Sequence, residues 1–101
     1  MAISFTRSII TRLEKEIADL QKLVREHKKK RDHMLAQIKQ LQRDQKLSQS
    51  MNDLSSKISR EVKLKKAIDE IDGILAQSTK QLAEKQARLA EQQQKQEQSA
   101  E

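Results

Sequence analysis

The sequence contains no cysteine and no proline, and it has one glycine, Gly73, and one aromatic residue, Phe5. The absence of cysteine excludes a disulfide framework and a thiolate zinc site. A compact β or α/β domain needs turn residues and a sizeable core, and this composition supplies neither. The chain also lacks a glycine-rich loop and an acid–base pair in a cleft, so we predict that it is not an enzyme and binds no cofactor.

Long apolar runs are also missing, so the sequence offers no signal peptide and no membrane span. In the opening segment, MAISFTRSIITRLEKE, Arg7 and Arg12 interrupt the apolar residues. We therefore predict a cytoplasmic protein with no membrane partner. The alternative is an N-terminal amphipathic helix that lies on lipid with the help of these two arginines.

Charge is abundant: charged residues make up 36% of the chain and hydrophobic residues 35%. Such a composition fits either a disordered chain or a coiled coil, and only a coiled coil places its apolar residues at fixed spacing. The net charge is +6, and all of the excess lies in residues 1–50, which hold twelve Lys or Arg and six Asp or Glu.

The first half of the chain has a heptad pattern, which predicts a coiled-coil helix over residues 3–45. The a positions are Ile3, Ile10, Ile17, Val24, Arg31, Ile38 and Gln45. The d positions are Thr6, Leu13, Leu20, His27, Met34, Leu41 and Ser48. Ile9 and Leu23 lie beside this seam and widen it, which is typical of a helix with more than one neighbour.

The segment from Asp44 to Asp53, DQKLSQSMND, is the one place where two long helices could meet at a turn. Ser50 followed by Asp53 resembles a capping box, in which a serine oxygen binds a free N–H group at a helix start. We predict a turn at residues 46–50 between two helices. Because neither glycine nor proline forces a break, one continuous helix in a parallel coiled coil is the alternative.

The second half predicts a helix over residues 51–92, with a frayed tail over residues 93–101. Its first apolar stripe consists of Met51, Leu54, Ile58 and Val62. The apolar spacing then changes phase and becomes regular at Leu64, Ile68, Ile71 and Leu75. Leu82 and Leu89 continue it. The segment from Glu91, EQQQKQEQSAE, is apolar only at Ala100, which is why we expect it to fray.

A turn centred near Ser48 would pair these helices in an antiparallel coiled-coil hairpin, so the predicted fold class is all-α. In that register Ile38 faces Ile58, and Arg31 comes level with Lys65. The predicted core of the hairpin is Met34, Ile38, Leu41, Leu54, Ile58, Ile68, Ile71 and Leu75. The open end would leave an apolar stripe exposed, and exposed stripes mark interfaces. We therefore predict self-association into a helical bundle through Ile9, Ile10, Leu13, Ile17, Leu20, Leu23 and Val24.

A basic collar, Lys28, Lys29, Lys30 and Arg31, is the candidate site for an anion or a nucleic acid. Four consecutive basic residues point all round a helix, and no aromatic residue is present to stack on bases, so we expect a solvated surface instead. The two histidines, His27 and His33, are six residues apart, which does not place them on one face for a metal.

Three segments resemble the N-terminal coiled-coil region that precedes the TIR domain in many bacterial TIR proteins. They are ISFTRSIITRLEKEIADLQK (Ile3 to Lys22), SQSMNDLSSKI (Ser48 to Ile58) and AIDEIDGILAQSTKQLAEKQARL (Ala67 to Leu89). The TIR domain itself, with its NAD-cleaving glutamate, has no room in this chain, so the resemblance implies no catalysis. It implies a scaffold that assembles or recruits a TIR-type effector in antiphage defence.

The sequence thus predicts a structural interaction protein whose partners are itself and a TIR-domain effector. Two alternatives are open: a nucleic-acid-binding module that uses the basic collar, and a chaperone or adaptor hairpin that binds an amphipathic helix of another protein.

Overall fold

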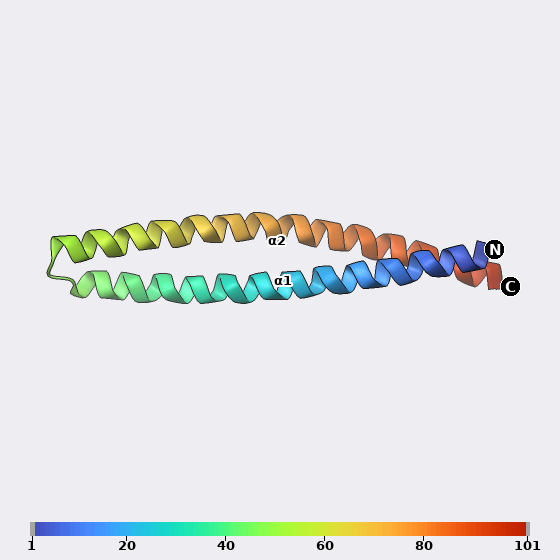
Figure 1. The fold of residues 1–101 in the computed structure, drawn as a ribbon, viewed down its shortest axis with the longest axis horizontal. Coiled ribbons are helices and arrows are strands. Elements are labelled where there is room, and N and C mark those ends of the chain that lie inside the picture. The colour runs from blue at the N-terminus through green and yellow to red at the C-terminus, as the bar shows by residue number, and fades with distance from the viewer. Residues whose placement is uncertain (1, 101) are drawn as a thin grey trace. The chain divides into compact units, whose positions relative to one another are not determined.

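Two long helices make up the chain in a computed structural model, which describes the backbone of residues 2–100 and the side chains of residues 5–98. Helix α1, Ala2–Leu47, has 46 residues, and helix α2, Met51–Ala100, has 50 residues (Figure 1). Three residues, Ser48 to Ser50, form the turn between them. The predicted helical hairpin is therefore confirmed, and the alternative of one continuous helix is wrong. Ile3 lies outside the described side chains.

The chain divides into two compact units. The turn unit is Glu26–Leu75 and contains the end of α1, the turn and the start of α2. The terminal unit combines Met1–Arg25 with Ala76–Glu101. Within the described residues, neither helix contains a segment long and apolar enough to cross a membrane.

Local hydrogen bonds explain where α1 ends and α2 begins. The Ser48 N–H donates to the Gln45 carbonyl at 3.3 Å and closes the last turn of α1. The Asp53 N–H donates to the Ser50 hydroxyl at 3.4 Å, and the Leu54 N–H donates to the Ser50 carbonyl at 2.9 Å. Ser50 therefore caps α2, as the capping-box pattern predicts. The break is shorter than the predicted 46–50, because Lys46 and Leu47 are helical.

Helix α1 uses the predicted heptad seam. Among the described side chains, no seam residue from Thr6 to Ser48 is exposed. The buried apolar members are Ile10, Leu13, Ile17, Ile38 and Leu41. The polar members His27, Arg31 and Gln45 are half-buried, so their alkyl or ring portions cover apolar surface within the seam.

Helix α2 has an equally regular seam, but its first turns differ from the prediction. Its seam positions follow one another at alternating steps of three and four, and all are buried or half-buried: Leu54, Lys57, Glu61, Leu64, Ile68, Ile71, Leu75, Ser78, Leu82, Lys85, Leu89, Gln92 and Gln96. Lys57 and Glu61 thus occupy seam positions where the sequence pattern favoured Ile58 and Val62. The predicted core assignment of Ile58 is wrong, because its side chain is exposed.

Bonds between the helices of the turn unit show that their pairing along the helix axis also differs from the prediction. Arg31 Nε donates to Asp72 Oδ1 at 2.6 Å, and Gln42 Nε2 donates to Glu61 Oε1 at 2.6 Å. The predicted pairing placed Arg31 level with Lys65, so the observed register lies about two helical turns farther along α2. This register replaces a repulsive pair of basic residues with an ion pair.

The terminal unit buries the apolar residues that the sequence led us to expect on an exposed open end. Leu13 is 1% exposed, and Ile10 and Ile17 are also buried. Lys85 Nζ donates to Glu16 Oε2 at 2.5 Å, which links α2 to α1 in this unit. The expectation that much of this stripe would be exposed is therefore wrong for Ile10, Leu13 and Ile17, which pack within the terminal unit.

The last residues of α2 also differ from the prediction, since the helix extends to Ala100 through the segment expected to fray. Glutamine, lysine, glutamate and alanine all favour helix, and Lys95 lies 3.6 Å from Glu91 one turn earlier. The expected fraying is thus replaced by helix over residues 93–100.

Candidate protein-binding surface

Two charged side chains lie in the α2 seam of the turn unit, at Lys57 and Glu61. Glu61 is 13% exposed, and its carboxylate accepts hydrogen bonds from Gln42 Nε2 at 2.6 Å and Gln45 Nε2 at 3.3 Å. Lys57 Nζ instead turns back to Asp53 Oδ2 at 2.6 Å, and the Ser48 hydroxyl donates to the same oxygen at 2.8 Å. Each charge in the seam therefore has partners within the chain.

These bonds lower two carboxylate pKa values. The Gln42 amide, and then the Gln45 amide, hold the pKa of Glu61 below its ordinary value of 4.5. The Lys57 ammonium, and then the Ser48 hydroxyl, hold the pKa of Asp53 below its ordinary value of 3.8. Both hydrogen bonds favour the charged carboxylate, which is the form present at neutral pH.

The lowered pKa of Glu61 predicts a loss of stability in acid. Because the folded pKa is below the unfolded value of 4.5, this group stabilises the fold above pH 4.5 and loses that contribution as the pH falls through the folded pKa. Urea unfolding, followed by circular dichroism between about pH 7 and about pH 3, measures it. Glu61→Gln is expected to show a shallower acid loss than the wild type, whereas Glu70→Gln, at an exposed position, should not. Equal acid slopes in all three proteins would contradict this role of Glu61.

Since Lys57 and Glu61 face α1, the apolar residues beside them in sequence face outward. Met51 is 84% exposed, Val62 is 60% exposed and Ile58 is 44% exposed. With the exposed Ser55, these residues follow one another at steps of four, three and four, which places them on one helix face. We call Met51, Ser55, Ile58 and Val62 the outer stripe.

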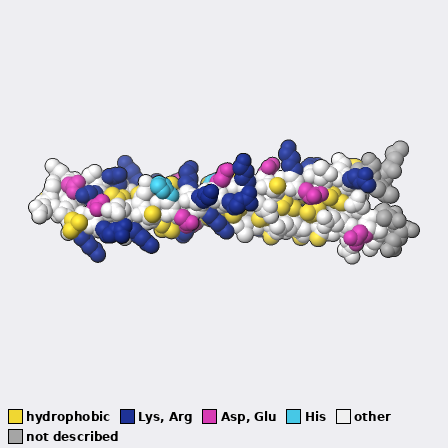
Figure 2. All heavy atoms as spheres, turned by 90° about the horizontal axis from the view of Figure 1, so that it is seen from below, with side chains coloured by type: hydrophobic (Ala, Val, Ile, Leu, Met, Phe, Trp, Pro, Cys, Tyr) yellow, Lys and Arg dark blue, Asp and Glu magenta, His cyan; other side chains and the backbone are white. Residues whose placement is uncertain are grey.

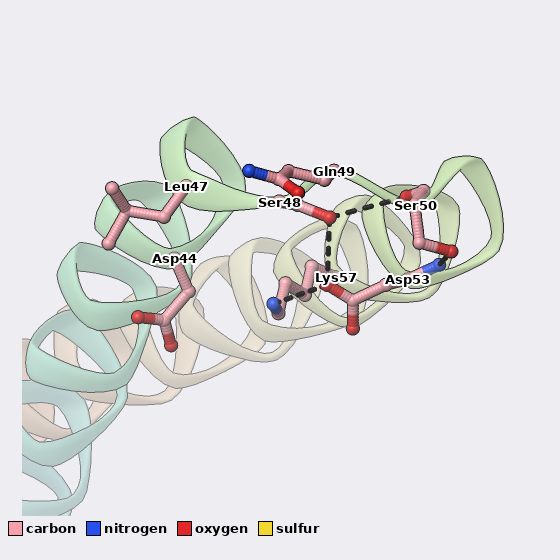
Figure 3. A pocket seen from close by; sticks show the side chains of 7 residues that line it. All are labelled: Asp44, Leu47, Ser48, Gln49, Ser50, Asp53 and Lys57. Atoms are coloured by element: carbon pink, nitrogen blue, oxygen red, sulfur yellow. Dashed lines mark hydrogen bonds and ion pairs between the residues drawn. The ribbon is translucent and has the colours of Figure 1, made fainter.

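Leu47, the last residue of α1 before the turn, is a further apolar side chain that is 79% exposed. Figure 3 shows the hydrogen bonds that hold the turn, from Ser48 and from Lys57 to Asp53, and from Asp53 to Ser50. An open hollow of about 480 Å³ lies here, and its lining combines side chains of both helix ends with the turn. These hydrogen bonds fix the conformation of the turn, which directly precedes Met51 in the sequence.

Basic residues are frequent in the part of the chain that carries the outer stripe. Residues 39–66 contain eight Lys or Arg and three Asp or Glu. Figure 2 shows Lys and Arg side chains crowding the visible face of the turn unit. Lys65 and Lys66 lie three and four residues after Val62, so they adjoin the outer stripe on the helix surface. The surface thus combines a narrow apolar stripe with a basic border.

The structure divides the predicted basic collar. Lys28, Lys29 and Lys30 are exposed, whereas Arg31 is half-buried and bonded to Asp72 at 2.6 Å. Three exposed lysines on successive positions point in different directions round the helix. The structure therefore offers fewer basic side chains to one ligand than the four that the sequence pattern indicated.

The predicted self-association residues lie in the terminal unit with mixed exposure. Ile10, Leu13 and Ile17 are buried, and Ile9, Leu20, Leu23 and Val24 are half-buried. Figure 2 shows an apolar strip on the visible face of this unit. The three buried residues already pack within the chain, so a second copy could contact only the half-buried ones.

The described residues contain no group of three or more His, Cys, Asp or Glu side chains placed to hold a metal ion. His27 is half-buried in the α1 seam and has a partner within the chain, whereas His33 is exposed. The structure does not bring these two side chains together into one site.

Comparisons with protein-family models, with curated proteins and with solved structures found no match to this chain. Functional inference therefore rests on the chain's own surface.

Sequence reasoning missed the outer stripe, although a signal for it is present. The regular spacing from Leu64 to Leu89, continued backward at steps of four and three, reaches Glu61, Lys57 and Leu54. That continuation excludes Ile58 and Val62 from the seam. The prediction assigned Ile58 and Val62 to the seam because they are more apolar than Lys57 and Glu61, although the spacing indicates the latter two.

Proposed function

We propose that this protein is a non-enzymatic scaffold, an antiparallel coiled-coil hairpin that binds another protein through the outer stripe and the adjoining turn. The exposure of Met51, Ile58 and Val62 on a helix that buries its other face carries this proposal. Contiguous exposed apolar residues with a polar rim are typical of protein interaction sites. The resemblance to the coiled-coil region of bacterial TIR proteins suggests a TIR-domain effector as the class of partner.

Self-association through residues 9–24 is the less favoured form of this scaffold. Leu13 and its neighbours already pack within the terminal unit, so bringing in a second copy there would add contacts only at the margin of the seam. A nucleic-acid-binding module is also less favoured, since Arg31 is committed to Asp72 and the three exposed lysines face different ways.

The scaffold proposal predicts a partner whose capture depends on the outer stripe. Affinity-tagged wild type, Val62→Asp and Phe5→Asp are produced in the natural host, and the proteins that co-purify are quantified by mass spectrometry. We expect at least one protein to be recovered with the wild type and lost with Val62→Asp, because a charge placed in an apolar interface is costly to bury.

Phe5→Asp is the matched control, since Phe5 is 69% exposed and lies in the terminal unit. It should retain the partner. Identical sets of proteins with all three baits would contradict the proposed function, and loss with both variants would indicate a general effect of added charge.

A further inference from the structure

The first turns of α2 carry two stripes of residues with coiled-coil spacing. One stripe, which includes Leu54, Glu61 and Leu64, packs within the hairpin. The other is the outer stripe, whose steps of four, three and four are those of a second heptad seam. A helix with two such seams can contact two helices at once. The spacing of the outer stripe therefore fits an α-helix as its occupant.

The charge around the outer stripe indicates what kind of helix fits. The acidic side chains of residues 39–66 all have hydrogen-bond partners in the chain, and they are Asp44, Asp53 and Glu61. In the described part of the chain, Arg60, Lys63 and Lys66 have no carboxylate partner. The uncompensated charge near the stripe is therefore positive, and it favours an acidic partner.

We propose that the outer stripe binds an acidic amphipathic α-helix of a partner protein, an inference that rests on the proposed scaffold function. Apolar residues of that helix pack against Met51, Ile58 and Val62. Its flanking carboxylates meet Lys66, which has no carboxylate partner of its own among the described residues, whereas Lys65 lies 3.6 Å from Glu61. The unbranched, polarizable Met51 can adjust to the partner's side chains. The heptad spacing of the outer stripe matches the shape of the partner helix. The basic residues beside the stripe set the orientation of that helix.

Two other occupants fit these observations less well. A second copy would bring the same basic surface, with eight Lys or Arg against three Asp or Glu in residues 39–66, so like charges would meet. A lipid surface does not require heptad spacing, and the outer stripe contains no aromatic residue of the kind that anchors helices at a membrane interface. A partner helix accounts for both the spacing and the charge.

A synthetic peptide tests the proposal directly. It has about three heptads with Leu at a and d and Glu at e and g, and a fluorescent label reports its binding to the full chain by anisotropy. We expect saturable binding that weakens as salt is raised. Val62→Asp should weaken binding at least about tenfold, and Lys66→Glu about threefold or more at low salt, since each removes one of the two proposed contributions. Phe5→Asp should bind as the wild type does.

Other probes separate the remaining outcomes. Equal binding of a peptide with Lys in place of Glu would overturn the assignment of an acidic partner. No peptide binding, combined with Val62-dependent binding to phosphatidylserine vesicles, would overturn it in favour of lipid. A dimer by light scattering that Val62→Asp dissociates would overturn it in favour of a second copy.

The two proposals fail in different ways. If the acidic peptide does not bind but Val62→Asp still loses a partner in the natural host, the scaffold function stands and the acidic helix is wrong. If neither readout depends on Val62, both are wrong. Circular dichroism of each variant monitors its helix content, and Lys66→Glu tests the surface without altering an apolar side chain.

Discussion

Replacing Leu13 with alanine is expected to lower the free energy of unfolding by about 2–5 kcal/mol, because it removes buried methyl groups and leaves a cavity. Leu13 is the large side chain that is most completely buried, at 1% exposed. It lies in the terminal unit, where the α2 seam facing it contains Lys85 and Gln92 as well as leucines. Few other apolar contacts can compensate for its loss. Urea unfolding followed by circular dichroism measures the change.

Phe5→Ala is the control in the same unit. Phe5 is 69% exposed, so its truncation should change the unfolding free energy by less than about 0.5 kcal/mol. The loss at Leu13 should also be independent of protein concentration, because its contacts lie within one chain. If the loss changed with protein concentration, Leu13 would pack between copies, as the heptad pattern alone suggested.

Replacing Glu61 with leucine is expected to raise the free energy of unfolding by about 1–3 kcal/mol, because an apolar side chain would fill a seam position now occupied by a carboxylate. The substitution removes hydrogen bonds from Gln42 and Gln45. Gln42 is exposed and Gln45 is half-buried, so water can take over these bonds. The gain from apolar burial is therefore expected to exceed the loss.

Val62→Leu is the control for this substitution, one residue along the helix. Val62 is 60% exposed, so a larger apolar side chain there should leave stability within about 0.5 kcal/mol of the wild type. The register predicted from the sequence pattern, with Ile58 facing Ile38, requires the opposite result. A stabilising Val62→Leu with a destabilising Glu61→Leu would show that Ile58 and Val62 face α1 in solution.

Much of the α1 helix and the turn could be predicted because their determinants are local. The apolar residues of α1 keep one heptad phase from Ile10 to Leu41, so the buried face follows from spacing alone. The cap at Ser50 follows from the hydrogen bond that a serine oxygen offers to an N–H group three residues later. The extent of α2 was underestimated, because a polar segment was equated with a frayed one.

The candidate site could not be predicted in the same way, because it depends on which of two apolar stripes faces α1. Met51, Ile58 and Val62 have the composition of a core, and only the spacing that runs back from Leu64 argues against that assignment. Their exposure follows from the phase of the seam through Leu64, Ile68 and Ile71, which turns Glu61 toward Gln42 of α1. Long-range pairing, and not residue type, assigns these side chains to the surface.

The sequence by itself determined two long helices, the break between them and the buried face of α1, since these depend on the composition, on capping at Ser50 and on heptad spacing. Only the tertiary structure decided the register of α2 and, with it, the outer stripe. The physical reason is that, along an uninterrupted α-helix, the residues that face inward at one turn determine which residues face inward at the neighbouring turns. The seam through Leu64, Ile68 and Ile71 sets that phase, so Lys57 and Glu61 turn inward and Ile58 and Val62 turn outward.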